Sequence, residues 1–281
     1  MKNISKYIIL MMVALVFACE ETINLDTLSS PSKVVIEAII TDTDDYNYIK
    51  LTKSRDFYSS GAPEFISNAA VKVTDNLGNE FNYIHNPNAD PALKGVYLPE
   101  TPYLGVVGRT YTMTVFAEGV EYKATETLQP VTAIDSLTVF FNQDEFDDPE
   151  DEGRYFEVLF YAEEPQDRTD YYLFKFYRNG ELLKDNDTDI YYSDDKLLSG
   201  RIDDLPTAGY FAEGDEVKVE MYSMPRSGFI FYNDLSTLLN NDGGLFTPPP
   251  ANPRSNITNG ALGYFHVGSM VKESIVIVDP R

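Results

Sequence analysis

Residues 70–84 read Ala-Val-Lys-Val-Thr-Asp-Asn-Leu-Gly-Asn-Glu-Phe-Asn-Tyr-Ile, and this stretch decides the fold class. Apolar and polar residues alternate on both sides of residues 75–79, and Gly78 stands where a tight turn favours positive φ. The stretch therefore predicts a β-hairpin with one buried face. Residues 111–116 and 120–127 repeat the pattern and predict a second hairpin, which turns at Glu118 and Gly119.

Further strands are expected before these hairpins. Residues 34–40 are β-branched and apolar, as in a buried strand, and residues 46–51 alternate. Strands that recur about every ten residues, without a long helical period, are typical of antiparallel sandwiches. We therefore expect a mainly β protein whose first immunoglobulin-like sandwich domain covers residues 33–130.

A second immunoglobulin-like β-domain is expected over residues 131–281, because Pro130 interrupts the pattern. One segment of it has helical periodicity, and this predicts a short helix at about residues 227–240. A proline-rich crossover at Pro248, Pro249 and Pro250 should follow, since consecutive prolines cannot join a sheet. The expected strands are residues 134–141, 155–161, 170–177, 215–222, 260–267 and 274–278.

The N-terminus has the pattern of an export signal. Lys2 and Lys6 precede an apolar run at residues 7–17, and the small residue Ala18 stands before Cys19, the only cysteine. Residues 16–19 resemble a bacterial lipobox, so residues 1–18 are predicted to be a lipoprotein signal peptide and Cys19 the lipidated residue. Residues 19–32 are polar and should form a tether to the fold.

Charge excludes some partners. Removal of the signal leaves 263 residues with 20 basic and 45 acidic side chains, a net charge near −25. Such a field repels nucleic acid and anionic lipid head groups. Membrane contact should therefore come through the lipid on Cys19.

Signs of catalysis are absent from the sequence. His85 and His266 are the only histidines, which leaves little for a Ser-His-Asp site or a zinc site, and both are expected to be structural. The sequence has no dinucleotide-binding glycine motif, phosphate-binding loop or HExxH motif. We therefore expect a non-enzyme with no catalytic residues and no cofactor, calcium being the one exception to consider.

Calcium prefers carboxylate oxygens, often from a single acidic loop. Residues 144–152 supply seven carboxylates without the EF-hand order, and otherwise they would form a solvated loop. The candidate ligands are Asp144, Glu145, Asp147, Asp148, Glu150, Asp151 and Glu152.

Residue types indicate two further candidate binding surfaces. Tyr171, Tyr172, Tyr191 and Tyr192 could stack on sugars, or they are ordinary strand residues. Residues 224–253 combine aromatic, Met and Arg side chains with rigid prolines, which favours a partner site, although the helix could instead close the end of its own sandwich. The candidate partner residues are Met224, Arg226, Phe229, Tyr232, Pro248, Pro249 and Pro250.

The chain resembles an uncharacterised family of Bacteroidota lipoproteins, the domain of unknown function 4249. The resemblance rests on the lipobox, on residues 25–40 and 68–79, and above all on residues 245–265. It implies an outer-membrane lipoprotein working beside a TonB-dependent receptor, with the cell surface favoured over the periplasmic face. It also implies that Glu20 and Glu21 act as a surface-export signal. Thr27 and Ser136 resemble O-glycosylation sites of this phylum.

The expected function is that of a non-catalytic accessory or binding subunit, which captures a ligand or stabilises the receptor complex. The alternatives are a structural or adhesion protein of the cell envelope, and then a carbohydrate-binding or carbohydrate-active protein.

Overall fold

Strands account for most of the regular structure in the computed structural model of the chain, so the predicted mainly β class is confirmed. The sheets form a sandwich-like or barrel arrangement. The structure describes residues 31–44, 46–55, 61–163, 165, 167–186, 188–195, 201–241 and 251–281. Cys19, Glu20, Glu21, Thr27 and the three consecutive prolines lie outside these ranges. Among the described residues, no helix combines the length and the apolar content that a membrane span requires.

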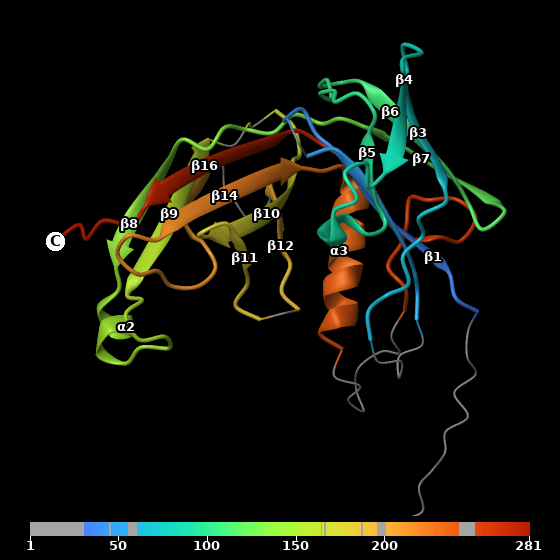
Figure 1. The fold of residues 1–281 in the computed structure, drawn as a ribbon. Helices are drawn as coiled ribbons and strands as arrows, with labels where there is room; N and C mark the ends of the chain where they lie inside the picture. Colours follow the sequence, from blue (N-terminus) through green and yellow to red (C-terminus); the bar gives the residue numbers. More distant parts are fainter. Residues whose placement is uncertain are drawn as a thin grey trace, which may run out of the picture. The chain divides into compact units, whose positions relative to one another are not determined.

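The first sheet has eight strands in the order β15-β1-β2-β5-β4-β3-β6-β7 (Figure 1). Both predicted hairpins are present in it, as β3–β4 and β6–β7. One buried cluster takes side chains from all eight strands, so the sheet curls around its own core. The strands are β1 (Val34–Ile40), β2 (Tyr48–Lys53), β3 (Ala70–Asp75), β4 (Glu80–His85), β5 (Val96–Pro99), β6 (Thr110–Ala117), β7 (Val120–Thr127) and β15 (Leu262–Val267); the short 3-10 helix η2 (Pro91–Leu93) stands between β4 and β5.

Strand β15 departs from the expected organisation. It was expected in a C-terminal domain, yet it pairs with β1, and the pair is parallel rather than antiparallel. Gly263 permits this pairing, because its φ is +96° and a Cβ there would lie 2.0 Å from the carbonyl oxygen of Ile36. Residues Ser32–Arg281 form one compact unit. Whether residues 33–130 and 131–281 are separate domains stays a prediction, but β15 crosses that boundary.

Two smaller sheets face each other across a second core. One has the order β11-β10-β14-β16 with β12 also paired to β10, and the other has the order β13-β9-β8. Phe160, Phe174, Phe176 and Met221 are buried between them. The strands are β8 (Ser136–Phe141), β9 (Phe156–Glu163), β10 (Tyr171–Arg178), β11 (Glu181–Leu183), β12 (Tyr191–Asp194), β13 (Arg201–Pro206), β14 (Glu216–Ser223) and β16 (Met270–Val276).

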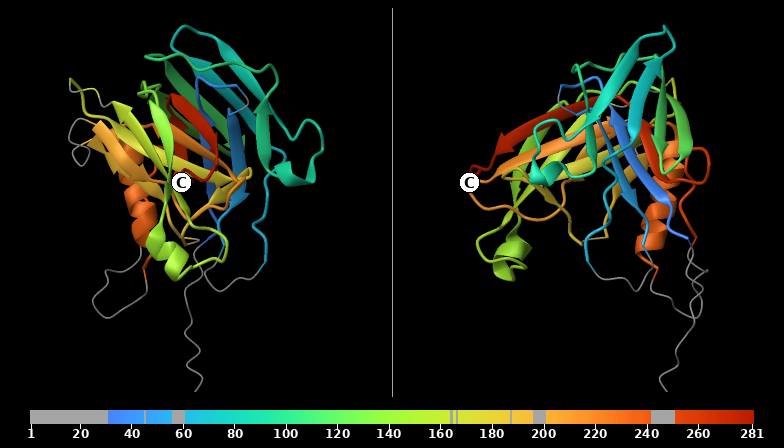
Figure 2. Two further views of the ribbon diagram at one scale, coloured as in Figure 1. Left: turned by 90° about the vertical axis from the view of Figure 1, so that its left-hand side faces the viewer. Right: turned by 45° about the vertical axis from the view of Figure 1, so that its right-hand side comes forward.

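Helix α3 (Arg226–Leu239) begins after Pro225 and confirms the predicted short helix within one residue at each end. It contacts β10, β12 and β15, and it is the orange helix of Figures 1 and 2. Its apolar side therefore packs on strands from both the eight-stranded sheet and the second sheet.

The acidic segment at residues 144–152 is expected from the sequence to be a loop, but part of it is helical. Helix α2 (Gln143–Asp147) begins there, and Figure 2 shows it at the end of the β8–β9 hairpin. The Asn142 side chain accepts a hydrogen bond from the Glu145 amide, and acidic residues in a first turn suit the positive end of a helix. Glu145 is buried and its carboxylate accepts a hydrogen bond from the Glu150 amide at 2.5 Å. The Asn142 cap and the burial of Glu145 thus give part of this charged segment regular structure, where the sequence predicts only a solvated loop.

Candidate ligand-binding cavity

A cavity of about 500 Å³ lies between β1, β10 and α3. It runs along β1 from Val35 to Ile39, a span of about 13 Å at the rise of an extended strand. Most of its wall is aliphatic or aromatic. The apolar residues that contact it include Val35, Ile39, Leu173, Leu183, Leu235 and Leu238.

The alternation of strand side chains explains why this wall exists. In β1, Ile36 and Ile40 enter the core of the eight-stranded sheet, so Val35, Glu37 and Ile39 face the opposite way. In β10, the even-numbered residues from Tyr172 to Phe176 fill the second core, and Leu173 and Lys175 face the cavity. The cavity therefore lies between the outer faces of two sheets, and α3 covers it.

Two charged side chains line the cavity in the middle of otherwise apolar strands. Glu37 accepts a 2.5 Å hydrogen bond from the Tyr48 hydroxyl and lies 4.0 Å from Lys50 Nζ. Lys175 Nζ lies 4.9 Å from the centre of the Tyr222 ring. Burial lowers the pKa of Lys175, and the nearby carboxylates only partly oppose this effect.

Behind Lys175, a fully buried carboxylate holds four donors. Glu220 on β14 accepts hydrogen bonds from Lys218 Nζ at 2.6 Å and from the hydroxyls of Tyr46, Tyr222 and Tyr177 at 2.6, 2.7 and 3.0 Å. Burial by itself raises the pKa of Glu220, but the hydrogen bonds from Lys218, Tyr46 and Tyr222 outweigh it, so the pKa lies below its usual value. Glu220 is therefore an ionised, satisfied group.

His266 is buried beside this cluster on β15. Its Nε2 lies 2.9 Å from the Ser223 carbonyl oxygen, to which it can only donate, and its Nδ1 has no partner in the described chain. Burial lowers the pKa of His266 to about 4. The other histidine, His85, accepts a hydrogen bond from the Gly95 amide. Each histidine thus uses its Nε2 in a hydrogen bond with the main chain.

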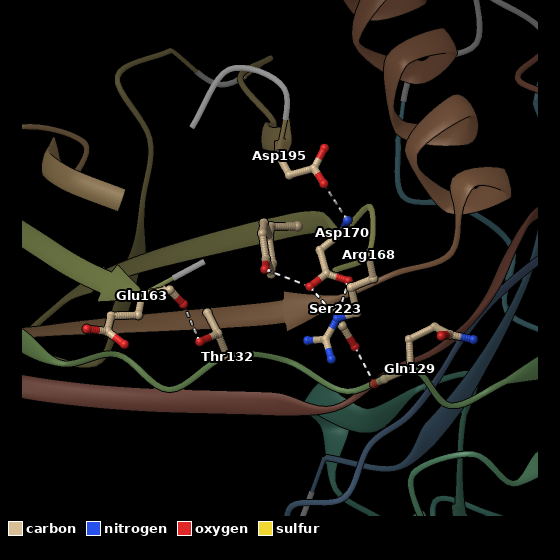
Figure 3. A network of polar contacts seen from close by, with 8 residues as sticks. Gln129, Thr132, Glu163, Arg168, Asp170, Asp195 and Ser223 are labelled. Carbon is tan, nitrogen blue, oxygen red and sulfur yellow. Dashed lines mark hydrogen bonds and ion pairs between the residues drawn. The ribbon is translucent and has the colours of Figure 1, made fainter. Parts of the chain in front are cut away.

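A polar network at one end of β10 joins the chain segment after β7 to the second sheet (Figure 3). The Ser223 hydroxyl donates to the Gln129 carbonyl at 2.6 Å, and the Ser269 amide donates to the same oxygen at 2.9 Å. Arg168 pairs with Asp170 at 2.7 Å. The contacts of Ser223 and Ser269 with Gln129 hold the residues before Pro130 against the second sheet.

Calcium binding by the acidic segment stays a prediction, and the described structure does not gather its carboxylates around one point. Within the described residues, no group of three or more His, Cys, Asp or Glu side chains is placed to hold a metal ion. Asp151 pairs instead with Arg154, and the Glu145 carboxylate is used by the Glu150 amide. The Ser136 position is exposed at the start of β8.

The predicted partner and sugar residues mostly contact their own chain. Met224 is buried, and Phe229 lies against Tyr171 and Tyr192, with ring centres 5.2 and 5.4 Å apart. Helix α3 thus packs on strands of two sheets, and its role as a partner site stays a prediction. Of the predicted set, Tyr232 lines the cavity, Arg226 is exposed and Tyr172 is fully buried.

Sequence reasoning missed Glu37, Lys175 and Glu220 as site residues. A signal for them exists in the sequence, because each is a charged residue inside an apolar strand. The pattern could not indicate that the first two face one cavity, since they come from different sheets.

Comparison with known proteins agrees with the resemblance noted above. The family model described as Domain of unknown function (DUF4249) matches residues 20–274, and the chain belongs to that family. No curated protein matches the chain.

Proposed function

We propose that this protein is a non-catalytic, lipid-anchored outer-membrane lipoprotein that binds a small, largely apolar molecule, as an accessory subunit of a TonB-dependent receptor. The cavity between β1, β10 and α3 is the observation that supports the binding role. Its volume lies within the ~300–1,000 Å³ of typical ligand sites, and its mostly apolar wall with a few convergent polar groups has their usual chemistry.

The geometry is better suited to binding than to catalysis. A general base must reach the substrate with a free nitrogen or oxygen. His85 is used by a main-chain amide, His266 is enclosed, and both oxygens of Glu220 are occupied by other side chains. Binding without turnover is therefore the activity we propose.

Lipidation of Cys19 would hold this binding unit at the membrane. The 14 residues from Cys19 to Ser32 can span at most about 45–50 Å when extended. The Ser32 hydroxyl and the Lys33 amide are both hydrogen-bonded to Ser54, so the tether joins the fold at a fixed point. A receptor in the same membrane would then lie within reach of the cavity.

Filling the cavity tests the binding role. Leu235→Trp replaces an aliphatic side chain of the cavity wall with a much larger indole ring. Leu239, one turn further along α3, is exposed and does not line the cavity. Native mass spectrometry of the full-length protein, released from a mild detergent, should show one bound molecule of the neutral probe N-phenyl-1-naphthylamine. Leu235→Trp should weaken binding at least tenfold and Leu239→Trp should leave it unchanged. Equal binding by both variants would contradict the proposal.

Capture of the native lipidated protein from its own outer membrane tests the partner. A TonB-dependent receptor recovered at near-equal amount is the expected result. Repeated recovery of the lipoprotein alone would contradict the accessory role and favour a free-standing binder or a structural protein of the envelope.

A further inference from the structure

The polar groups along the cavity differ in whether the protein already satisfies them. Glu37 has its Tyr48 hydrogen bond, Tyr191 donates to Asp185, and Tyr264 lies within hydrogen-bond distance of Ser227. Asp189 accepts from the Asn186 amide, and Lys184 also has an interaction within the chain. These groups therefore need no hydrogen-bond partner from a ligand.

Lys175 is the exception, although a carboxylate lies directly across the sheet from it. Lys175 and Glu220 are opposite each other in the β10–β14 register. The two oxygens of Glu220 already accept from three tyrosines and Lys218. Within the described chain, Lys175 makes no hydrogen bond or ion pair: its ammonium contacts the Tyr222 ring face, and the carboxylates of Glu220 and Glu37 act on it only through their charge. An ammonium that is partly removed from water without an acceptor costs free energy.

The Tyr232 hydroxyl is a second donor at the cavity without a hydrogen-bond partner among the described residues. Tyr232 belongs to α3 and Lys175 belongs to β10, and both line the cavity. The unmet groups are thus an ammonium and a hydroxyl, both of which can donate to an anion.

We propose that the cavity takes an elongated apolar molecule that carries one carboxylate, with the carboxylate bound by Lys175 and Tyr232 and the apolar part lying along β1. This inference rests on the proposed binding function and names its ligand class. An amine is disfavoured, because both carboxylates at the cavity are already engaged: Glu37 is bonded to Tyr48 and lies near Lys50, and Asp189 accepts from the Asn186 amide.

Lys272 supplies a matched control. It faces Glu220 from the other side in the β14–β16 register and lies over the Tyr46 ring at 5.1 Å, as Lys175 lies over Tyr222. Lys272 does not line the cavity. A substitution at either lysine removes one positive charge beside Glu220, but only the change at Lys175 removes a charge from the cavity.

The experiment compares decanoate, decanol and decylamine, whose chains are of a length similar to the cavity, by native mass spectrometry of the full-length protein. The wild type should bind decanoate at least tenfold more tightly than the other two, as expected for a charged hydrogen bond. Lys175→Met should lose this preference while binding decanol normally, and Lys272→Met should behave as the wild type.

Two outcomes would overturn the inference: equal binding of decanol or decylamine by the wild type, or unchanged decanoate binding by Lys175→Met. If Lys175→Met also loses decanol binding, the Tyr232→Phe variant provides the test. It should weaken decanoate binding several-fold and leave decanol binding unchanged. Unchanged decanoate binding by Tyr232→Phe would then overturn the inference. A wild type that binds none of the three probes contradicts the proposed binding function itself.

Discussion

Replacing the buried carboxylate of Glu220 should destabilise the protein strongly. Glu220→Gln keeps the shape of the side chain but removes the charge that pairs with Lys218 Nζ at 2.6 Å and orders three tyrosine hydroxyls. Breaking a buried ion pair typically costs about 3–5 kcal/mol. We expect the lower end, about 3 kcal/mol, because the Lys218 side chain is 27% exposed and water can solvate it after the change.

Thermal unfolding measured by circular dichroism would show this loss. For a chain of this size, 1 kcal/mol shifts the melting temperature by about 2–4 °C, so a decrease of about 6–12 °C is expected. Glu273→Gln is the matched control, since Glu273 is an exposed residue on the adjacent strand β16 and its change should be within about 0.5 kcal/mol.

The pH dependence gives a second readout for the same variant. The folded pKa of Glu220 is below its ordinary value of 4.5 because hydrogen bonds outweigh burial. Its contribution to stability is therefore present above that value and is lost as pH falls through the folded pKa. This part of the acid-induced loss should be missing in Glu220→Gln. A melting temperature within 2 °C of the wild type, with an unchanged acid profile, would refute the reasoning.

Two further predictions concern the β1–β15 pair and the buried histidine. Gly263→Ala should lower the free energy of unfolding in urea by about 3 kcal/mol or more, because a Cβ at this positive φ would lie 2.0 Å from the Ile36 carbonyl oxygen. Gly78 also has positive φ but open space around it, so Gly78→Ala should lower it by only about 1–2 kcal/mol. Equal losses in the two variants would contradict this prediction. Because burial lowers the pKa of His266 to about 4, the unfolded chain takes up its proton first as pH falls. The free energy of unfolding should therefore decrease by up to about 3 kcal/mol as pH falls from 6.5 to 4, and His266→Gln should remove that decrease. If the variant still shows the decrease, groups other than His266 cause it.

Local patterns in the sequence predicted much of the fold. The hairpin at residues 70–84 formed where alternation and Gly78 indicated, and α3 formed where the helical stripe indicated. Helix α2 was missed, because its cap depends on the single side chain Asn142, which a composition-based reading of the acidic segment overlooked.

The candidate site was much less predictable. Tyr232 was singled out for a partner, but it faces a cavity within the protein. Lys175 and Glu220 were not singled out at all, since a charged residue in a strand shows its role only when its cross-strand neighbours are known.

By itself, the sequence determined the β class, the hairpins, the short helix and the family, because each depends on residues close together along the chain. Only the tertiary structure decided that β15 joins β1, that α3 covers a cavity, and that Lys175 lies there while the carboxylate opposite it serves other donors. These features depend on register and on the packing of sheet faces between residues up to about 230 positions apart, and periodicity along the chain carries no information about which faces meet.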